Sequence, residues 1–226
     1  MRVLIISAHP DDEVIGAGGT IARHADKGDD IYWCVVTDAY SPPWSEDYLR
    51  IAKEQVYGVK EVLSIKEVFF CGFPTVKLNT VPYIDISTAI QKIVDKVKPE
   101  IVYTTPRNDI NQDHRIVHDC TLVATRPFPG STIKRLLSYE IGPTNRYGFS
   151  NGSSGFPPNI FVDISPYLEK KLEAMRCYKT ELQEYPNPRS LEGLRLLARE
   201  CGLGVGMEAA EAFRLIREIQ STDSED

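Results

Sequence analysis

Short apolar runs alternate with amphipathic segments along the first half of the chain. The runs are rich in β-branched and aromatic residues, as is typical of buried parallel strands, and they cover residues 3–6, 31–37, 67–71 and 100–105. The segments between them have helical periodicity and cover residues 20–27, 46–63 and 83–97. This alternation predicts an α/β fold with three layers, in which a mainly parallel sheet has helices on both faces.

The second half is expected to begin with a long loop. Residues 142–158 are dominated by Gly, Ser, Asn and Pro, which favour irregular structure, and a loop of that length often serves as a lid. A further strand is predicted over residues 160–164, followed by a C-terminal helical part over about 165–220, with helices at 167–180, 191–201 and 208–220. The apolar residues of these helices are expected to pack on the sheet or to form the subunit interface of a homo-oligomer.

Composition indicates a single domain over residues 1–226. A chain with 42% hydrophobic and 26% charged residues can bury a substantial core. Its formal net charge of −6 argues against nucleic-acid binding, because proteins that bind phosphate backbones concentrate Lys and Arg. No run approaches the roughly 18 apolar residues that a membrane span needs, so we expect no such span. The five cysteines are widely spaced without a Cys-x-x-Cys, which favours a reducing compartment, the cytoplasm.

The first cluster of chemically active side chains follows the first predicted strand directly. It comprises His9, Asp11, Asp12 and Glu13. The acids could simply cap the next helix, where carboxylates offset the exposed amides and the helix dipole. Three consecutive acids exceed what capping requires, however, and imidazole with carboxylate is a zinc-type ligand set. We favour a cation site that takes one further ligand from elsewhere.

A second cluster follows the fourth predicted strand, over residues 108–115 at the start of a predicted helix. In an open α/β sheet, the loops beyond the carboxyl ends of the strands meet at one edge, so His114 can supply the missing ligand. His118 stands one helical turn further and could geometrically bind the same ion. We expect it beside the site instead, since His9, Asp12 and His114 already complete a three-ligand set.

Asp113 is predicted to orient an active-site imidazole, because metal-binding histidines need a partner for their second nitrogen. Capping of the helix is the alternative role for this carboxylate. The glycines at positions 16, 18 and 19 offer a different hypothesis, a phosphate-cradling loop. They lack the full dinucleotide fingerprint and follow several carboxylates, so close backbone packing explains them as well.

Together, the stretch Ala-His-Pro-Asp-Asp-Glu over residues 8–13 and Gln-Asp-His over 112–114 resemble the motifs of the LmbE-like, or PIG-L-like, zinc-dependent N-deacetylases. The resemblance implies a Rossmann-like fold and removal of acetyl from N-acetylglucosamine groups. It also implies one Zn²⁺ per chain, held by His9, Asp12 and His114, with Asp11 as the general base.

The chain departs from the family in its second motif, which usually begins with His where this sequence has Asn111. An asparagine cannot donate a proton as an imidazolium does, although its amide can hydrogen-bond an oxyanion. Protonation of the leaving amine would then fall to Asp11, which carries the proton taken from water, or to His118. The expected reaction is attack of zinc-activated water on the amide carbonyl.

Substrate contacts are predicted at Arg50 and Asp38, with aromatic packing from Trp44, Tyr147 and Phe149 against the sugar ring. A surface ion pair and a turn are the plainer interpretations of Arg50 and Asp38. Two other functions stay open. One is metal-dependent hydrolysis of a different amide or ester, and the other is a nucleotide-sugar or dinucleotide binding module, which would keep its ligand after chelation.

Overall fold

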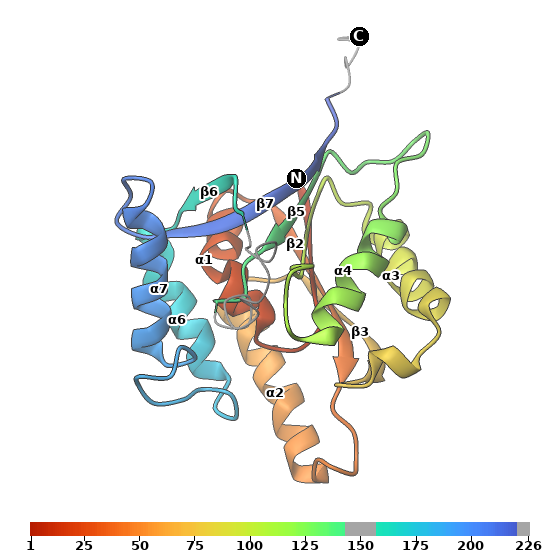
Figure 1. Ribbon diagram of the computed structural model, residues 1–226, viewed down its shortest axis with the longest axis horizontal. Helices are drawn as coiled ribbons and strands as arrows, with labels where there is room; N and C mark the ends of the chain where they lie inside the picture. The colour runs from red at the N-terminus through yellow and green to blue at the C-terminus, as the bar shows by residue number, and fades with distance from the viewer. Residues whose placement is uncertain (143–156, 221–226) are drawn as a thin grey trace.

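The computed structural model describes residues 1–142 and 157–220, which build one seven-stranded sheet with helices on both faces (Figure 1). The strands are Arg2–Ser7 (β1), Asp30–Asp38 (β2), Glu67–Pro74 (β3), Ile101–Thr104 (β4), Arg135–Tyr139 (β5), Ile160–Asp163 (β6) and Ala210–Glu218 (β7). Their order in the sheet is β3-β2-β1-β4-β5-β7-β6. Strands β1 to β5 run parallel to one another, and β7 pairs antiparallel with both of its neighbours, β5 and β6. The predicted α/β class is confirmed.

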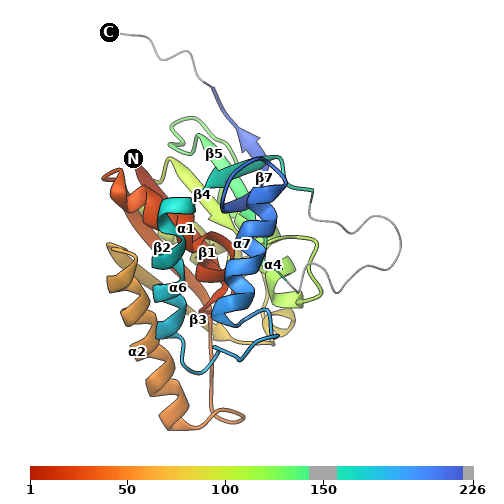
Figure 2. The same ribbon diagram turned by 90° about the vertical axis from the view of Figure 1, so that its left-hand side faces the viewer.

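The larger helices are Asp12–Asp26 (α1), Glu46–Val62 (α2), Tyr83–Val97 (α3), Gln112–Ala124 (α4), Leu168–Cys177 (α6) and Leu191–Leu203 (α7). Helices α3 and α4 lie on one face of the sheet, and α1, α2, α6 and α7 on the other (Figures 1 and 2). None of the described helices has the length and apolarity that crossing a bilayer demands.

Strand β1 shows why the sheet is covered on both sides. Val3 and Ile5 belong to the core beneath α1, whereas Leu4 and Ile6 belong to the core beneath α3 and α4. All four side chains are fully buried, since successive residues of a strand point to opposite faces. A continuous apolar run is therefore what this central strand requires.

The helix predicted over residues 208–220 is wrong, because this segment is strand β7. Ala, Glu, Leu and Arg have good helix propensity, which misled the interpretation. In the fold, the segment lies between β5 and β6, and Phe213 pairs with Tyr139 on one side and Ile160 on the other. Pairing on both sides outweighs local propensity. Strand β5 had no prediction.

The apolar C-terminal side chains divide between core and surface. Leu194 and Phe213 are buried, whereas Leu196 and Leu203 are exposed. A subunit interface stays a prediction. Most of the predicted loop at 142–158, with Tyr147 and Phe149, lies outside the described residues.

Helix α1 begins at Asp12, well before the predicted start at residue 20, and its three glycines are its points of close approach. A Cβ on Gly16 would clash with the Tyr139 ring, and one on Gly19 would lie 2.8 Å from Ile164. Because glycines lower helix propensity, the helical pattern over this stretch is weak. Their role is packing against β5 and the segment after β6, as the second interpretation of this run expected.

Gly19→Ala should therefore lower the free energy of unfolding by about 1–3 kcal/mol, because the added methyl group overpacks against Ile164. Gly58→Ala in α2 is the matched control, since the Cβ added to this helical glycine would meet Cys177 Sγ at 3.4 Å, an ordinary van der Waals contact. Urea denaturation of both variants measures the difference. Equal stability of the two would contradict this account of the packing.

Candidate metal and catalytic site

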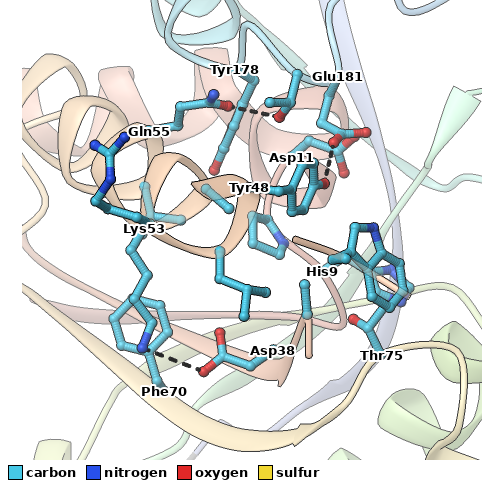
Figure 3. A pocket seen from close by; sticks show the side chains of 18 of the residues that line it. His9, Asp11, Asp38, Tyr48, Lys53, Gln55, Phe70, Thr75, Tyr178 and Glu181 are labelled. Atoms are coloured by element: carbon cyan, nitrogen blue, oxygen red, sulfur yellow. Dashed lines mark hydrogen bonds and ion pairs between the residues drawn. The ribbon is translucent and has the colours of Figure 1, made fainter. Parts of the chain in front are cut away.

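The site lies between β1 and β4, at the point where the order of the strands in the sheet reverses direction. Strands β1 and β4 are neighbours in the sheet but separated in sequence, so the loops that follow them meet at its carboxyl edge. A cavity of about 600 Å³ opens there. His9, Asp11 and Asn111 contribute to its wall, and Figure 3 shows Asp38 and Lys53 facing the same cavity.

The three predicted ligands, His9, Asp12 and His114, come together at this edge of the sheet. His114 Nε2 lies 3.3 Å from His9 Nδ1 and 3.2 Å from Asp12 Oδ1, and His9 Nδ1 lies 3.6 Å from Asp12 Oδ2. Two ligand atoms bound tetrahedrally at zinc distances stand about 3.3 Å apart. The donor spacing therefore already suits one such ion.

Each imidazole has a carboxylate on the nitrogen that faces away from the other donors. His9 Nε2 lies 3.0 Å from Asp113 Oδ2, and His114 Nδ1 lies 2.9 Å from Asp109 Oδ2. Such partners fix the tautomer and the ring orientation of a metal-binding histidine. Asp113 thus contacts one imidazole of this group, and its predicted role in orienting an active-site imidazole stays a prediction.

The carboxylates around His9 and His114 favour positive charge on the two imidazole rings. Burial opposes protonation of His9, yet its bonds to Asp113 and Asp12 raise the pKa of His9 to about 9. Burial likewise opposes protonation of His114, but the charge of Asp12 and hydrogen bonds to Asp109 and Asp12 raise its pKa to about 10. The protons on the two imidazole rings supply positive charge that offsets the buried carboxylates, and a bound divalent cation would supply the same charge in their place. Donor types, spacing and charge all fit a metal ion.

Asp11 lies beside the three predicted metal ligands, but its side chain points into the cavity. Its side chain lines the cavity at 2% exposure, and among the described residues its buried Oδ2 has no hydrogen-bond partner. Arg189 Nη2 is 3.5 Å from that oxygen. Burial raises the pKa of Asp11 to about 7, against the opposing charge of Arg189. A carboxylate with these properties can accept a proton near neutral pH.

The other residues of the second cluster divide into two groups. Asn111 lines the cavity and is the N-cap of α4, where its Oδ1 accepts the Asp113 N–H at 3.0 Å, so Asp113 is not the cap. His118 is buried, and its Nδ1 donates to the Thr105 carbonyl at 2.8 Å. It belongs neither to the cavity wall nor to the group of three ligands.

The predicted substrate contacts lie along the cavity wall. Asp38 is half-buried, with Lys53 Nζ at 4.0 Å, and Arg50 is exposed and pairs with Glu54 at 2.7 Å. Trp44 also lines the cavity. The Arg50–Glu54 contact is the surface ion pair that was the alternative interpretation of Arg50. The Arg50 side chain nevertheless lines the cavity.

Sequence reasoning missed several residues of the site. Asp109 was within the second cluster but received no role, although a loop carboxylate near a histidine was a signal for it. Three others line the cavity from the segment between α6 and α7: Tyr178, Glu181 and Arg189. Nothing in their local sequence marks them, because only the fold brings that segment to β1.

Comparison with known proteins supplies the family. The family described as PIG-L, GlcNAc-PI de-N-acetylase, matches residues 4–125, which contain both clusters. The chain belongs to this family. Its PIG-L match ends before the segment that adds Tyr178 and Arg189 to the cavity.

Three similar proteins extend beyond that match. The diacetylchitobiose deacetylase of Thermococcus kodakarensis is 27% identical over 95% of this chain and 83% of its own length. The solved N,N'-diacetylchitobiose deacetylase from Pyrococcus horikoshii has a TM-score of 0.76 at 23% identity, covering 95% of this chain and 83% of that one. GalB, the 4-carboxy-2-hydroxymuconate hydratase of Pseudomonas putida, has a TM-score of 0.75 at 19% identity, covering 97% and 98%. At these identities the solved structures show the fold alone, and a fold does not determine a reaction.

Asp109→Asn should weaken zinc affinity by about 10- to 100-fold, because the His114 ring loses the carboxylate that orients it. Competition with a chromogenic chelator measures the affinity. Asp119→Asn is the matched control, since this α4 residue pairs with Arg107 at the surface. Unchanged affinity in Asp109→Asn would contradict the orienting role given to Asp109.

Proposed function

We propose that this protein is a zinc-dependent hydrolase that removes the acetyl group from an N-acetylated amino sugar of the N-acetylglucosamine type. One observation carries the proposal: the buried Asp11 carboxylate, whose Oδ2 has no hydrogen-bond partner among the described residues, stands beside a His–Asp–His donor set, and Asp11 and His9 line one cavity. Family membership and the curated deacetylase relative support the reaction class and the sugar.

In this proposal, His9, Asp12 and His114 hold one Zn²⁺ per chain, since two imidazoles and a carboxylate are a ligand set used by catalytic zinc. The same set also accepts other divalent ions, which are the alternative. When bound, such an ion polarises the amide carbonyl and lowers the pKa of water. Three protein ligands leave room in the coordination sphere. Asp109 and Asp113 keep the two rings in the required orientation.

Asp11 moves the protons. Its carboxylate accepts one proton from the water that attacks the acetyl carbon, and it then passes that proton to the amide nitrogen as the C–N bond breaks. The products are acetate and the free amino sugar. Asp11 is placed to do this because its Oδ2 is committed to no hydrogen bond among the described residues.

Asn111 is proposed to assist at the carbonyl oxygen. Its Oδ1 is occupied by the α4 cap, so the group it can offer to the cavity is the amide N–H₂, a donor suited to an oxyanion. His118 is the weaker candidate for amine protonation, because one ring nitrogen is bonded to Thr105 and the ring lies away from the cavity wall.

The sugar is proposed to bind along α2. Asp38 and Arg50 supply polar contacts, and Trp44 and Tyr48 form a stacked aromatic pair with ring centroids 6.3 Å apart. Aromatic faces pack well against the apolar face of a pyranose ring. A cavity of about 600 Å³ lies within the range of pockets that enclose small organic ligands.

Asp11→Asn should lower kcat for N-acetylglucosamine or diacetylchitobiose by about 10²- to 10⁴-fold, because an amide cannot accept the proton of water. Bound zinc should stay near one ion per chain, since Asp11 is not a ligand. Amine release and elemental analysis measure the two quantities. Chelation should abolish activity in the parent, and zinc restore it.

Two outcomes would contradict the proposal. Loss of zinc from Asp11→Asn would make Asp11 a ligand rather than a base. The parent enzyme could also bind about one zinc ion per chain and yet release no amine from either sugar. That result would support the metal site but contradict the proposed reaction.

Asp38→Asn should raise KM for the sugar by about tenfold while kcat changes little, because a contact made equally in ground and transition states affects binding alone. Steady-state kinetics separate the two constants. Asp30→Asn serves as the control, since this residue pairs with Lys66 at the opposite end of β2. An unchanged KM would exclude Asp38 from the sugar site.

A further inference from the structure

Glu13 is a fully buried carboxyl group that neither the metal ligands nor the proposed proton transfer uses. Both of its oxygens accept hydrogen bonds. Oε1 accepts from the Tyr178 hydroxyl at 2.6 Å, and Oε2 accepts from the Asp11 backbone N–H at 3.2 Å. A buried carboxyl group needs such partners, but their identity is informative because one is the backbone of the proposed base.

The backbone at Asp11 is strained. Its φ is 99° and its ψ is −30°, a conformation that residues other than glycine rarely adopt. Such conformations persist only where surrounding contacts hold them, and they concentrate at functional sites. The Asp11 carbonyl accepts the N–H groups of Val14 and Ile15, and its N–H has Glu13 as acceptor.

The turn at Asp11 sends two consecutive carboxylates in different directions. Asp12 folds back, and its Oδ2 accepts the N–H groups of Ala8 at 3.1 Å and His9 at 2.9 Å. Its Oδ1 faces His114. Asp11 instead enters the cavity, where its Oδ2 has no hydrogen-bond partner among the described residues. A regular helical start would not separate a ligand from a base in this way.

A first-turn acid can reach back to the N–H of the N-cap residue, here Asp11, as in a capping box. Glu13 departs from that pattern because it is the second helical residue rather than the third, is fully buried, and bonds Tyr178 through its other oxygen. Helix α1 has a second buried carboxylate contact that fits a packing role. Glu211 accepts from the N–H groups of Gly19 and Thr20 and from Lys171. Glu13 differs, because it reaches back to the residue that precedes the helix.

We propose that Glu13 and Tyr178 form a positioning pair that holds the Asp11 backbone in its strained turn and thereby aims the Asp11 carboxylate into the cavity. Tyr178 comes from the segment after α6, 165 residues away in sequence from Glu13, so this pair couples the C-terminal part of the chain to the catalytic loop. The proposal rests on the proposed function for the kinetic role of Asp11. Its structural part stands independently.

The test uses Glu13→Met, which removes both acceptors at nearly constant volume, and Tyr178→Phe, which removes only the hydroxyl. In a crystal structure of either variant, Asp11 should leave the positive-φ region and its carboxylate should turn out of the cavity. With the sugar substrate, kcat should fall at least about tenfold, since misplaced catalytic groups lose rate steeply, while bound zinc stays near one ion per chain.

Both substitutions are also made in the Asp11→Asn background. There they should lower the residual kcat by less than about twofold, because the pair acts through Asp11 alone. Tyr103→Phe is the matched control, a buried tyrosine whose hydroxyl bonds His24, and neither residue lines the cavity. It should lower the melting temperature without changing kcat.

The possible results separate this inference from the proposed function. An Asp11 turn unchanged in both variant structures overturns the positioning pair, whatever the activity. So does an equal loss of kcat in the parent and Asp11→Asn backgrounds, which indicates a general structural role. Parent protein that releases no amine overturns the proposed function, while the crystal structures still decide the pair. If Glu13→Met does not fold, Tyr178→Phe alone carries both measurements.

Discussion

The structure depends on one constraint: two imidazoles and a carboxylate share a buried space where none can be left without a compensating charge. Strands β1 and β4 lie side by side, and the loops beyond them bring His9 and Asp12 against His114. Burying such groups is unfavourable unless each is paired. The pairing is complete, because Asp113 and Asp109 take the outer ring nitrogens, and the raised imidazole pKa values show how strongly the carboxylates favour positive charge.

This constraint also explains why the adjacent carboxylates of Asp11 and Asp12 have different roles. Asp12 is committed to His114 and to the backbone N–H groups of the loop, and its pKa is lowered, chiefly by the charge of His114 acting against burial. Asp11, one residue earlier, is buried without a hydrogen-bond partner for its Oδ2 in the described part of the chain, and burial raises its pKa. Burial opposes ionisation of both neighbouring carboxylates, but Asp12 bonds the two histidines, and their effect outweighs burial there and lowers its pKa. The strained turn at Asp11 is what allows this.

Much of this arrangement could be predicted from sequence, and the failures have physical causes. Strand β1 was predictable because full burial on both faces demands an unbroken apolar run, and the histidines were predictable because they follow strands that end at one edge. Strand β7 was missed because its composition favours a helix, and only pairing on both sides makes it a strand. Tyr178 and Arg189 could not be found, since their contacts with Glu13 and Asp11 depend on the packing of distant segments.

The measurement that tests the central claim most directly is anomalous diffraction at the zinc absorption edge, from crystals of the protein equilibrated with zinc. The account predicts a single strong peak bounded by His9 Nδ1, His114 Nε2 and an Asp12 oxygen, with both outer ring nitrogens still bonded to their carboxylates. A peak ligated by Asp11 or His118, or no peak among the three donors, would contradict it.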